Sequence, residues 1–378
     1  MSKDSTETVG EAICDGTGPV RRRGEQRDGA VDPVVAWVVE KRLADEAGVS
    51  ASHVSRVEAG LLPLAGKALL DYAQAMECRP EALCVPFTRS PAQGSHFRAN
   101  LSAAEWKRDR VWARANLVAM RIGRLVSRAD INPKLALPDL DPADYASELG
   151  EITVAQVLRR LWRVAGPIRS MTELLEAAGV FVVVDGFLDD EIDAVTLRAS
   201  EYHPHLVYVN AARPPDRMRM TLAHELGHLV MDAMTLVSPA EAERRANSFA
   251  AEFLAPIADI GFDLDRVSVR AVHELDELRL TWGVSASSLV VRARERGVLS
   301  DYQYRSMFRL LNETGRMYGP RPGVAEEMPR LVGDVLGQLA AGGYTASELD
   351  DITLLTGAQR GALFGVSDRP GARHLTMV

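Results

Sequence analysis

Two histidines stand four residues apart at His224 and His228, and this pair constrains the fold more than any other feature of the chain. Residues four apart lie on one face of an α-helix, one turn from each other. The two imidazoles therefore point to a common place and can fill two corners of a tetrahedral zinc site. Glu225 stands beside them, where a carboxylate can take a proton from a water molecule. The pattern predicts a helix with two metal ligands and a general base.

Apolar residues fill the rest of this stretch, which places the histidine pair inside a domain. They are Met220, Leu222, Ala223, Leu226 and Leu229. Buried imidazoles without partners are costly, so each ring must find either a metal ion or hydrogen bonds. The alternative to a metal site is therefore a pair of histidines held by hydrogen bonds alone. Gly227 predicts that another element approaches the helix closely.

A third protein ligand is required, because a catalytic zinc site keeps its fourth position open. Residues 238–241, Ser-Pro-Ala-Glu, open a second helix that offers Glu241, Glu243 and Glu252. Glu243 is favoured, since it shares a helical face with small residues that permit close packing. Glu241 is expected to cap its own helix, and Glu252 points elsewhere. Asn247, one turn beyond Glu243, is placed to orient a metal ligand.

Two blocks in this order carry a resemblance to a known family. Residues 216–228 end in His-Glu-Leu-Gly-His, and residues 243–256 carry Glu-x-x-Ala-Asn-x-Phe-Ala and run on to Leu-x-Pro. Together they resemble the ImmA/IrrE-type metallopeptidases over roughly residues 152–310. Met220 departs from the pattern, which usually has an aromatic residue there. The resemblance implies that His224, His228 and Glu243 bind Zn²⁺ and that Glu225 is the base.

The same resemblance implies a cytoplasmic endopeptidase that cuts a partner regulator, such as a repressor or an antitoxin-like protein. An extended substrate is expected to add to an exposed sheet edge near Leu206 to Asn210. Help for the developing oxyanion would come from a nearby polar side chain. The candidates, between which the sequence does not decide, are Tyr202, His203, His205, Tyr208 and Arg219.

A helix-turn-helix is predicted within residues 33–86. A short helix leads to Gly48 and an N-cap at Ser50, and a second helix from Ala51 ends before Gly60. Two short helices joined by a glycine-containing turn are typical of this motif. The stretch resembles XRE-type DNA-binding domains. By that resemblance the DNA-facing residues would be Ser50, Ser52, His53, Ser55 and Arg56.

The N-terminal unit also departs from the XRE pattern. Glu40 stands where a glutamine is usual, and the unit holds five basic and seven acidic residues, a net charge of −2. Acidic groups repel the phosphate backbone of DNA. Two alternatives stay open: operator binding, or a degenerate module that serves for homodimerisation or for docking a partner.

The remaining chain completes a mostly helical α+β protein. Residues 1–32 lack apolar periodicity and are predicted to be a disordered tail. Residues 87–150 hold a linker, over 87–101, and then a long basic helix. That helix either packs its apolar face on the next domain or contacts nucleic acid. Residues 151–312 form the metallopeptidase domain with three short strands, and residues 313–378 a helical C-terminal region.

Charge and hydropathy narrow the function classes. The net charge of −8 and the pI of about 5.6 argue against a chain that coats nucleic acid by bulk charge. The sequence has no apolar run long enough to span a membrane and no segment that resembles an export leader. A cytoplasmic location is therefore expected. Three hypotheses follow: a zinc endopeptidase, a DNA-binding regulator that uses the peptidase fold as a sensor, and a pseudoenzyme. The complete residue set argues against the last.

Overall fold

The fold is the predicted α+β arrangement, mostly helical, around one small sheet. The computed structural model describes residues 40–76, 78–85, 96–99, 105–145, 150–186, 192–231, 237–316 and 323–365. Four strands form the sheet in the order β1-β3-β4-β2, with β2 parallel to β4 and the other neighbours antiparallel. They are β1 (His96–Ala99), β2 (Phe181–Asp185), β3 (Ile192–Leu197) and β4 (Leu206–Asn210).

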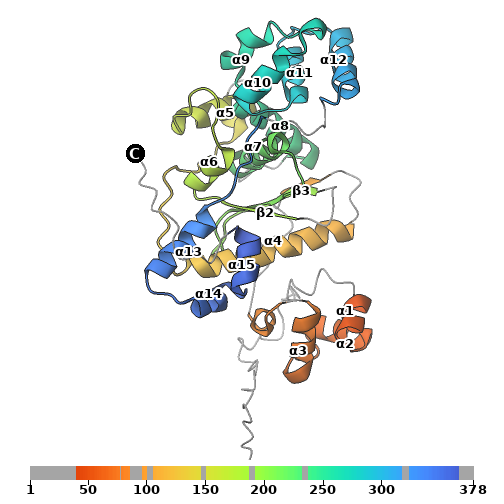
Figure 1. Ribbon diagram of the computed structural model, residues 1–378, viewed down its shortest axis with the longest axis vertical. Coiled ribbons are helices and arrows are strands. Elements are labelled where there is room, and N and C mark those ends of the chain that lie inside the picture. Colours follow the sequence, from red (N-terminus) through yellow and green to blue (C-terminus); the bar gives the residue numbers. More distant parts are fainter. Residues whose placement is uncertain are drawn as a thin grey trace, which may run out of the picture.

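Each face of the sheet is covered by helices, which makes three layers (Figure 1). The first face carries α5 (Gly150–Leu161), α6 (Met171–Ala177), α7 (Pro215–Met231) and α8 (Pro239–Leu254). The second carries α4 (Glu105–Val126), α13 (Leu331–Ala341), α14 (Ala346–Thr353) and α15 (Gly357–Phe364). The strands divide their side chains accordingly: Val182 enters the first core, whereas Phe181 and Val183 enter the second.

Four further helices extend the first core beyond α8. They are α9 (Ile257–Leu264), α10 (Glu274–Trp282), α11 (Ala286–Glu295) and α12 (Asp301–Glu313). A buried ion pair between Glu252 of α8 and Arg292 of α11 ties this group together. Gln156 of α5 donates to the same carboxylate at 2.9 Å. Glu252 therefore joins α8 to α5 and α11, which agrees with the prediction that it points away from the histidines.

The N-terminal unit contains α1 (Glu40–Glu46), α2 (Ala51–Glu58) and α3 (Gly66–Ala75). Gly48 and Gly60 have φ of 65°, so each ends a helix in the left-handed conformation that glycine adopts readily. Leu43, Val54 and Tyr72 form a small core that continues into α4. The tail over residues 1–32 lies outside the described residues.

The long basic helix predicted after the linker is α4, and its contacts favour the packing alternative. Its apolar face lies against the sheet, with Ile122 fully buried. Arg114 donates to Asp185 at 3.1 Å, and Arg124 donates to the backbone oxygen of Ile352 at 2.7 Å. These guanidinium groups therefore join α4 to the sheet and to the C-terminal helices.

One strand was not predicted, and another has a different position in the sheet from the one expected. β1 falls inside residues 87–101, which were predicted to be a linker, and pairs with β3. β4 lies between β3 and β2, so the predicted substrate edge near Leu206 to Asn210 is wrong. β4 already has a hydrogen-bonded strand on each side, so no peptide can add to it. Within the described residues, no helix is both long and apolar enough to cross a membrane.

Candidate metal centre

Helix α7 carries the histidine pair through the first core. It begins at Pro215, a residue suited to a first helical position. Asp216 pairs with Arg279 at 3.2 Å, and Arg217 pairs with Asp193 of β3 at 2.8 Å. From Met218 onward nearly every residue of α7 is buried. The histidines are therefore held in place by a helix that is packed on all sides.

Helix α8 supplies the third side chain. The side-chain oxygen of Ser238 accepts from the backbone N–H of Glu241 at 3.3 Å, so Ser238 caps α8, and the prediction that Glu241 caps this helix is wrong. The carboxylate of Glu241 does not return to the Ser238 backbone but binds Arg244 and Arg245, and these bonds lower the pKa of Glu241 to about 2. Of the three glutamates considered from the sequence, Glu243 alone reaches the histidines.

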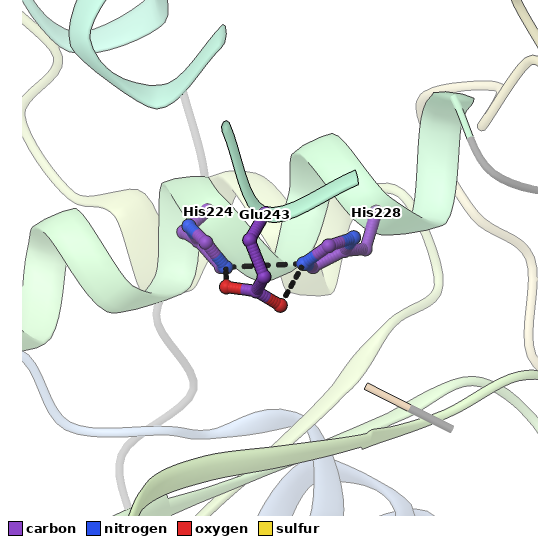
Figure 2. A group of neighbouring side chains, drawn as sticks. All are labelled: His224, His228 and Glu243. Carbon is purple, nitrogen blue, oxygen red and sulfur yellow. Dashed lines mark hydrogen bonds and ion pairs between the residues drawn. The ribbon is translucent and has the colours of Figure 1, made fainter. Parts of the chain in front are cut away.

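Three donor atoms converge between α7 and α8, and Figure 2 shows the arrangement. The Nε2 atoms of His224 and His228 lie 3.0 Å apart, and the carboxylate of Glu243 lies 3.2 Å and 3.3 Å from them. Zinc binds nitrogen and oxygen ligands at about 2.0–2.1 Å, so neighbouring corners of its tetrahedron are about 3.3 Å apart. The two nitrogen atoms have about this spacing, and the Glu243 carboxylate meets each of them at a similar distance through a different oxygen. Among the described residues this is the group that could hold a metal ion.

Charge favours the metal-binding form of the cluster. Burial opposes ionisation of Glu243, but hydrogen bonds and charge from the two histidines outweigh it and hold the pKa of Glu243 well below its usual value. Its side chain is 42% exposed, whereas both imidazoles are buried. The cluster therefore has one side toward solvent, as a site that admits a substrate requires.

Asn247 of α8 contacts the ring of His224. Its Oδ1 atom lies 3.0 Å from Nδ1 of His224. The amide oxygen can only accept a hydrogen bond, so the imidazole carries its proton on Nδ1. When this imidazole is neutral, Nε2 can therefore offer its lone pair to a metal ion.

Glu225 lies on the sheet side of α7 and is fully buried. The hydroxyl of Thr196, on β3, donates to its Oε2 atom at 2.6 Å. Its Oε1 atom is buried without a hydrogen-bond partner. A buried carboxylate oxygen without a hydrogen-bond partner lowers the stability of the fold, so its presence indicates a functional role. Sequence reasoning missed Thr196, and its only signal was a polar residue at an inward position of a predicted strand.

Gly227 lies where α7 and α8 approach each other most closely. A methyl group at this position would lie 2.9 Å from a ring carbon of Phe249 and 3.4 Å from the Cα atom of Ala246. We expect Gly227→Ala to separate the helices, which costs about 1–3 kcal/mol of stability and weakens metal binding. Thermal unfolding and metal titration check this result. Gly337→Ala is the matched control, because a methyl group on that helical glycine meets nothing within 4 Å.

The five polar residues proposed for the oxyanion do not gather at the metal ligands. Tyr208 donates to Asp185 at 2.5 Å on the α4 side of the sheet. Arg219 binds Glu327 and three backbone oxygens, those of Ile168, Arg169 and Gly283. Burial and the charge of Arg198 lower the pKa of His205 to about 4, and its Nδ1 accepts from Ala199. His203 is likewise buried, and Tyr202 is exposed.

The residues predicted to face DNA lie on α2 and its cap. Ser50 accepts from the backbone N–H of His53 at 3.2 Å and is the N-cap of the helix. Ser52, Ser55 and Arg56 are exposed, whereas Val54 is fully buried in the core. His53 lies 3.1 Å from the hydroxyl of Tyr72 and is partly occupied by that contact.

Comparison with known families identifies part of the chain. Residues 176–294 match the Peptidase_M78 family model, described as an IrrE N-terminal-like domain. The matched stretch contains β2, β3, β4, α7 and α8, and with them every residue of the metal cluster. A search of curated proteins finds no match. The family match supports a metallopeptidase-like role for this part of the chain, and such peptidases use a metal, usually zinc.

Proposed function

We propose that this protein is a zinc-dependent endopeptidase that cuts a partner regulator, either a repressor or an antitoxin-like protein. One observation carries the proposal: the imidazoles of His224 and His228 and the carboxylate of Glu243 converge between α7 and α8, at distances of 3.0–3.3 Å, and α7 also carries the buried Glu225. His224, His228 and Glu243 would hold the metal. The family match over residues 176–294 supports the peptidase class.

The roles of the side chains follow from their contacts. Zinc, when bound, supplies Lewis acidity that polarises the scissile carbonyl and makes water a better nucleophile. Oε1 of Glu225 takes the proton of the attacking water and then returns it to the leaving amine. Thr196 holds Oε2, which fixes the direction of Oε1. Asn247 keeps Nε2 of His224 turned toward the cluster.

New amino termini in a protein extract test the proposed function. The full chain, loaded with Zn²⁺, is incubated with extract of its own organism, and the new termini are labelled and identified. We expect a short set of cleavage sites, dominated by one regulator, that disappears with a chelator and returns with Zn²⁺. A broad set of sites, or a set that a chelator leaves intact, would contradict a regulator-specific metallopeptidase.

We also propose that the N-terminal unit reads DNA through α2. Support comes from the exposed side chains of Ser52, Ser55 and Arg56, which stand opposite the buried Val54. Under the alternative function, a DNA-binding regulator with a sensing peptidase fold, this unit would be the active part. A salt-dependent gel shift on the promoter of its own gene tests it. Absence of a shift at low salt would leave docking or dimerisation as its role.

Thr196 offers a test of the proposed base. Thr196→Val removes the hydroxyl but keeps the shape, so Glu225 loses its one hydrogen bond. A hydrogen bond to a charged group contributes about 1.5–3 kcal/mol, and we expect kcat to fall roughly 10- to 100-fold. KM should change little, because the hydroxyl is buried and bonded to Glu225. Thr196→Ser restores the donor and should restore kcat, which a purely structural role would not require.

A further inference from the structure

β1 lies along the edge of the sheet that faces the candidate catalytic residues. It pairs antiparallel with β3, with His96 opposite Thr196, Phe97 opposite Val195 and Arg98 opposite Ala194. Thr196 is the residue that donates to Glu225. β1 also approaches α7, the helix that carries the histidines. The four residues of β1 thus run beside the base and belong to the segment that joins the N-terminal unit to α4.

The topology leaves one edge for strand addition at this place. β4 covers one side of β3 along Leu206 to Val209, so the remaining ladder of β3 is that taken by β1. The opposite edge of the sheet belongs to β2, which lies two strands away from Thr196. An extended peptide that pairs directly with the strand of Thr196 must therefore take the place of β1.

β1 is a short and weakly paired strand. It has four residues against the six of β3, and its register shifts between Arg98 and Ala99. A short strand with an irregular ladder contributes few hydrogen bonds. β3, in contrast, is buried along its whole length. An uncovered buried strand readily accepts another chain, so loss of β1 would create a strong peptide-binding edge.

We propose that β1 is an internal occupant of the substrate edge, and that an extended segment of the protein substrate replaces it. The inference rests on the proposed peptidase function and names its substrate-binding surface. The substrate segment pairs antiparallel with β3, in the place of residues 96–99, and lies across Glu225. The peptidase is then held latent by its own chain, and a movement of the N-terminal unit that pulls on β1 releases it.

Tethering explains why a free peptide should bind poorly to the unchanged chain. A strand linked to its site has an effective concentration of roughly millimolar, so a micromolar peptide does not compete. Substitutions that prevent β1 from pairing with β3 remove that competitor. The probe is a fluorescent synthetic peptide with the sequence of residues 93–101, and its binding is followed by anisotropy. All chains carry Glu225→Gln, so that cleavage plays no part in the result.

Three full-length chains are compared. Phe97→Pro/Arg98→Pro opposes strand pairing, because proline lacks an N–H and does not fit a ladder. Phe97→Val/Arg98→Thr is the matched control, since β-branched residues favour strands. We expect the proline chain to bind the probe at least tenfold more tightly than the parent and the control. Hydrogen exchange should then show new protection on the amides of β3.

Equal binding by the three chains, no binding by any of them at millimolar probe, or protection away from β3 would overturn the proposal. Circular dichroism and zinc content establish that each chain is folded. Phe97→Gly/Arg98→Gly weakens the strand while keeping its N–H groups, and it must give the same order of affinities if the proline chain does not fold. The binding assay needs no catalysis, whereas the peptidase proposal is tested by cleavage alone. The two proposals can therefore fail independently.

Discussion

Replacement of Glu225 by glutamine is expected to abolish peptide-bond cleavage while zinc stays at about one ion per chain. Glutamine keeps the shape of the side chain and the bond from Thr196 but cannot take up a proton. General-base catalysis contributes about 10²- to 10⁴-fold, so kcat should fall by that factor. The three donor atoms belong to other residues, so the metal is kept. Cleavage of the identified regulator and metal analysis of the same sample measure both effects.

Glu241→Gln is the matched control for this experiment. It makes the same change on α8, close to the cluster in sequence, at a carboxylate that binds Arg244 and Arg245. We expect nearly full activity from it. An active Glu225→Gln chain would remove Glu225 from the mechanism and with it the peptidase proposal.

His228→Ala is expected to eliminate metal binding. Two side chains, His224 and Glu243, would remain of the three that converge at this place. Loss of the metal also removes its contribution to stability, about 2.7 kcal/mol at a free metal concentration 100 times the Kd. A chelator should therefore lower the Tm of the parent chain and leave that of His228→Ala unchanged.

His273→Ala is the control for the histidine experiment, because the His273 side chain is 72% exposed and lies far from the cluster in sequence. It should bind zinc and respond to the chelator as the parent does. A His228→Ala chain that still binds one zinc with unchanged affinity would show that the metal sits elsewhere.

Local spacing explains why so much of the site could be predicted. His224 and His228 are one turn apart on α7, and Glu243 and Asn247 are one turn apart on α8. Helical geometry fixes such relations without knowledge of the tertiary fold. In the structure the two pairs lie together, and Oδ1 of Asn247 is 3.0 Å from Nδ1 of His224. The same locality made the glycine-ended helices of the N-terminal unit predictable.

Contacts between distant segments were out of reach. Thr196 and Glu225 are 29 residues apart, and β1 pairs with a strand about a hundred residues later. Strand pairing depends on the whole sheet, and a four-residue strand in a segment with proline and glycine has no distinctive periodicity. The order of β4 within the sheet could not be inferred either, since a buried apolar run fits a central or an edge position equally well.

The second face of the sheet limits how this protein can be divided. The family match ends at residue 294, yet Val195 and Tyr208 of the matched strands belong to a core that also includes residues of α4, which precedes the match, and of α13 to α15, which follow it. A fragment trimmed to the matched residues would expose that apolar face to water and should associate or precipitate. We therefore expect the smallest piece that keeps both faces of the sheet covered to begin before α4 and to end after Phe364.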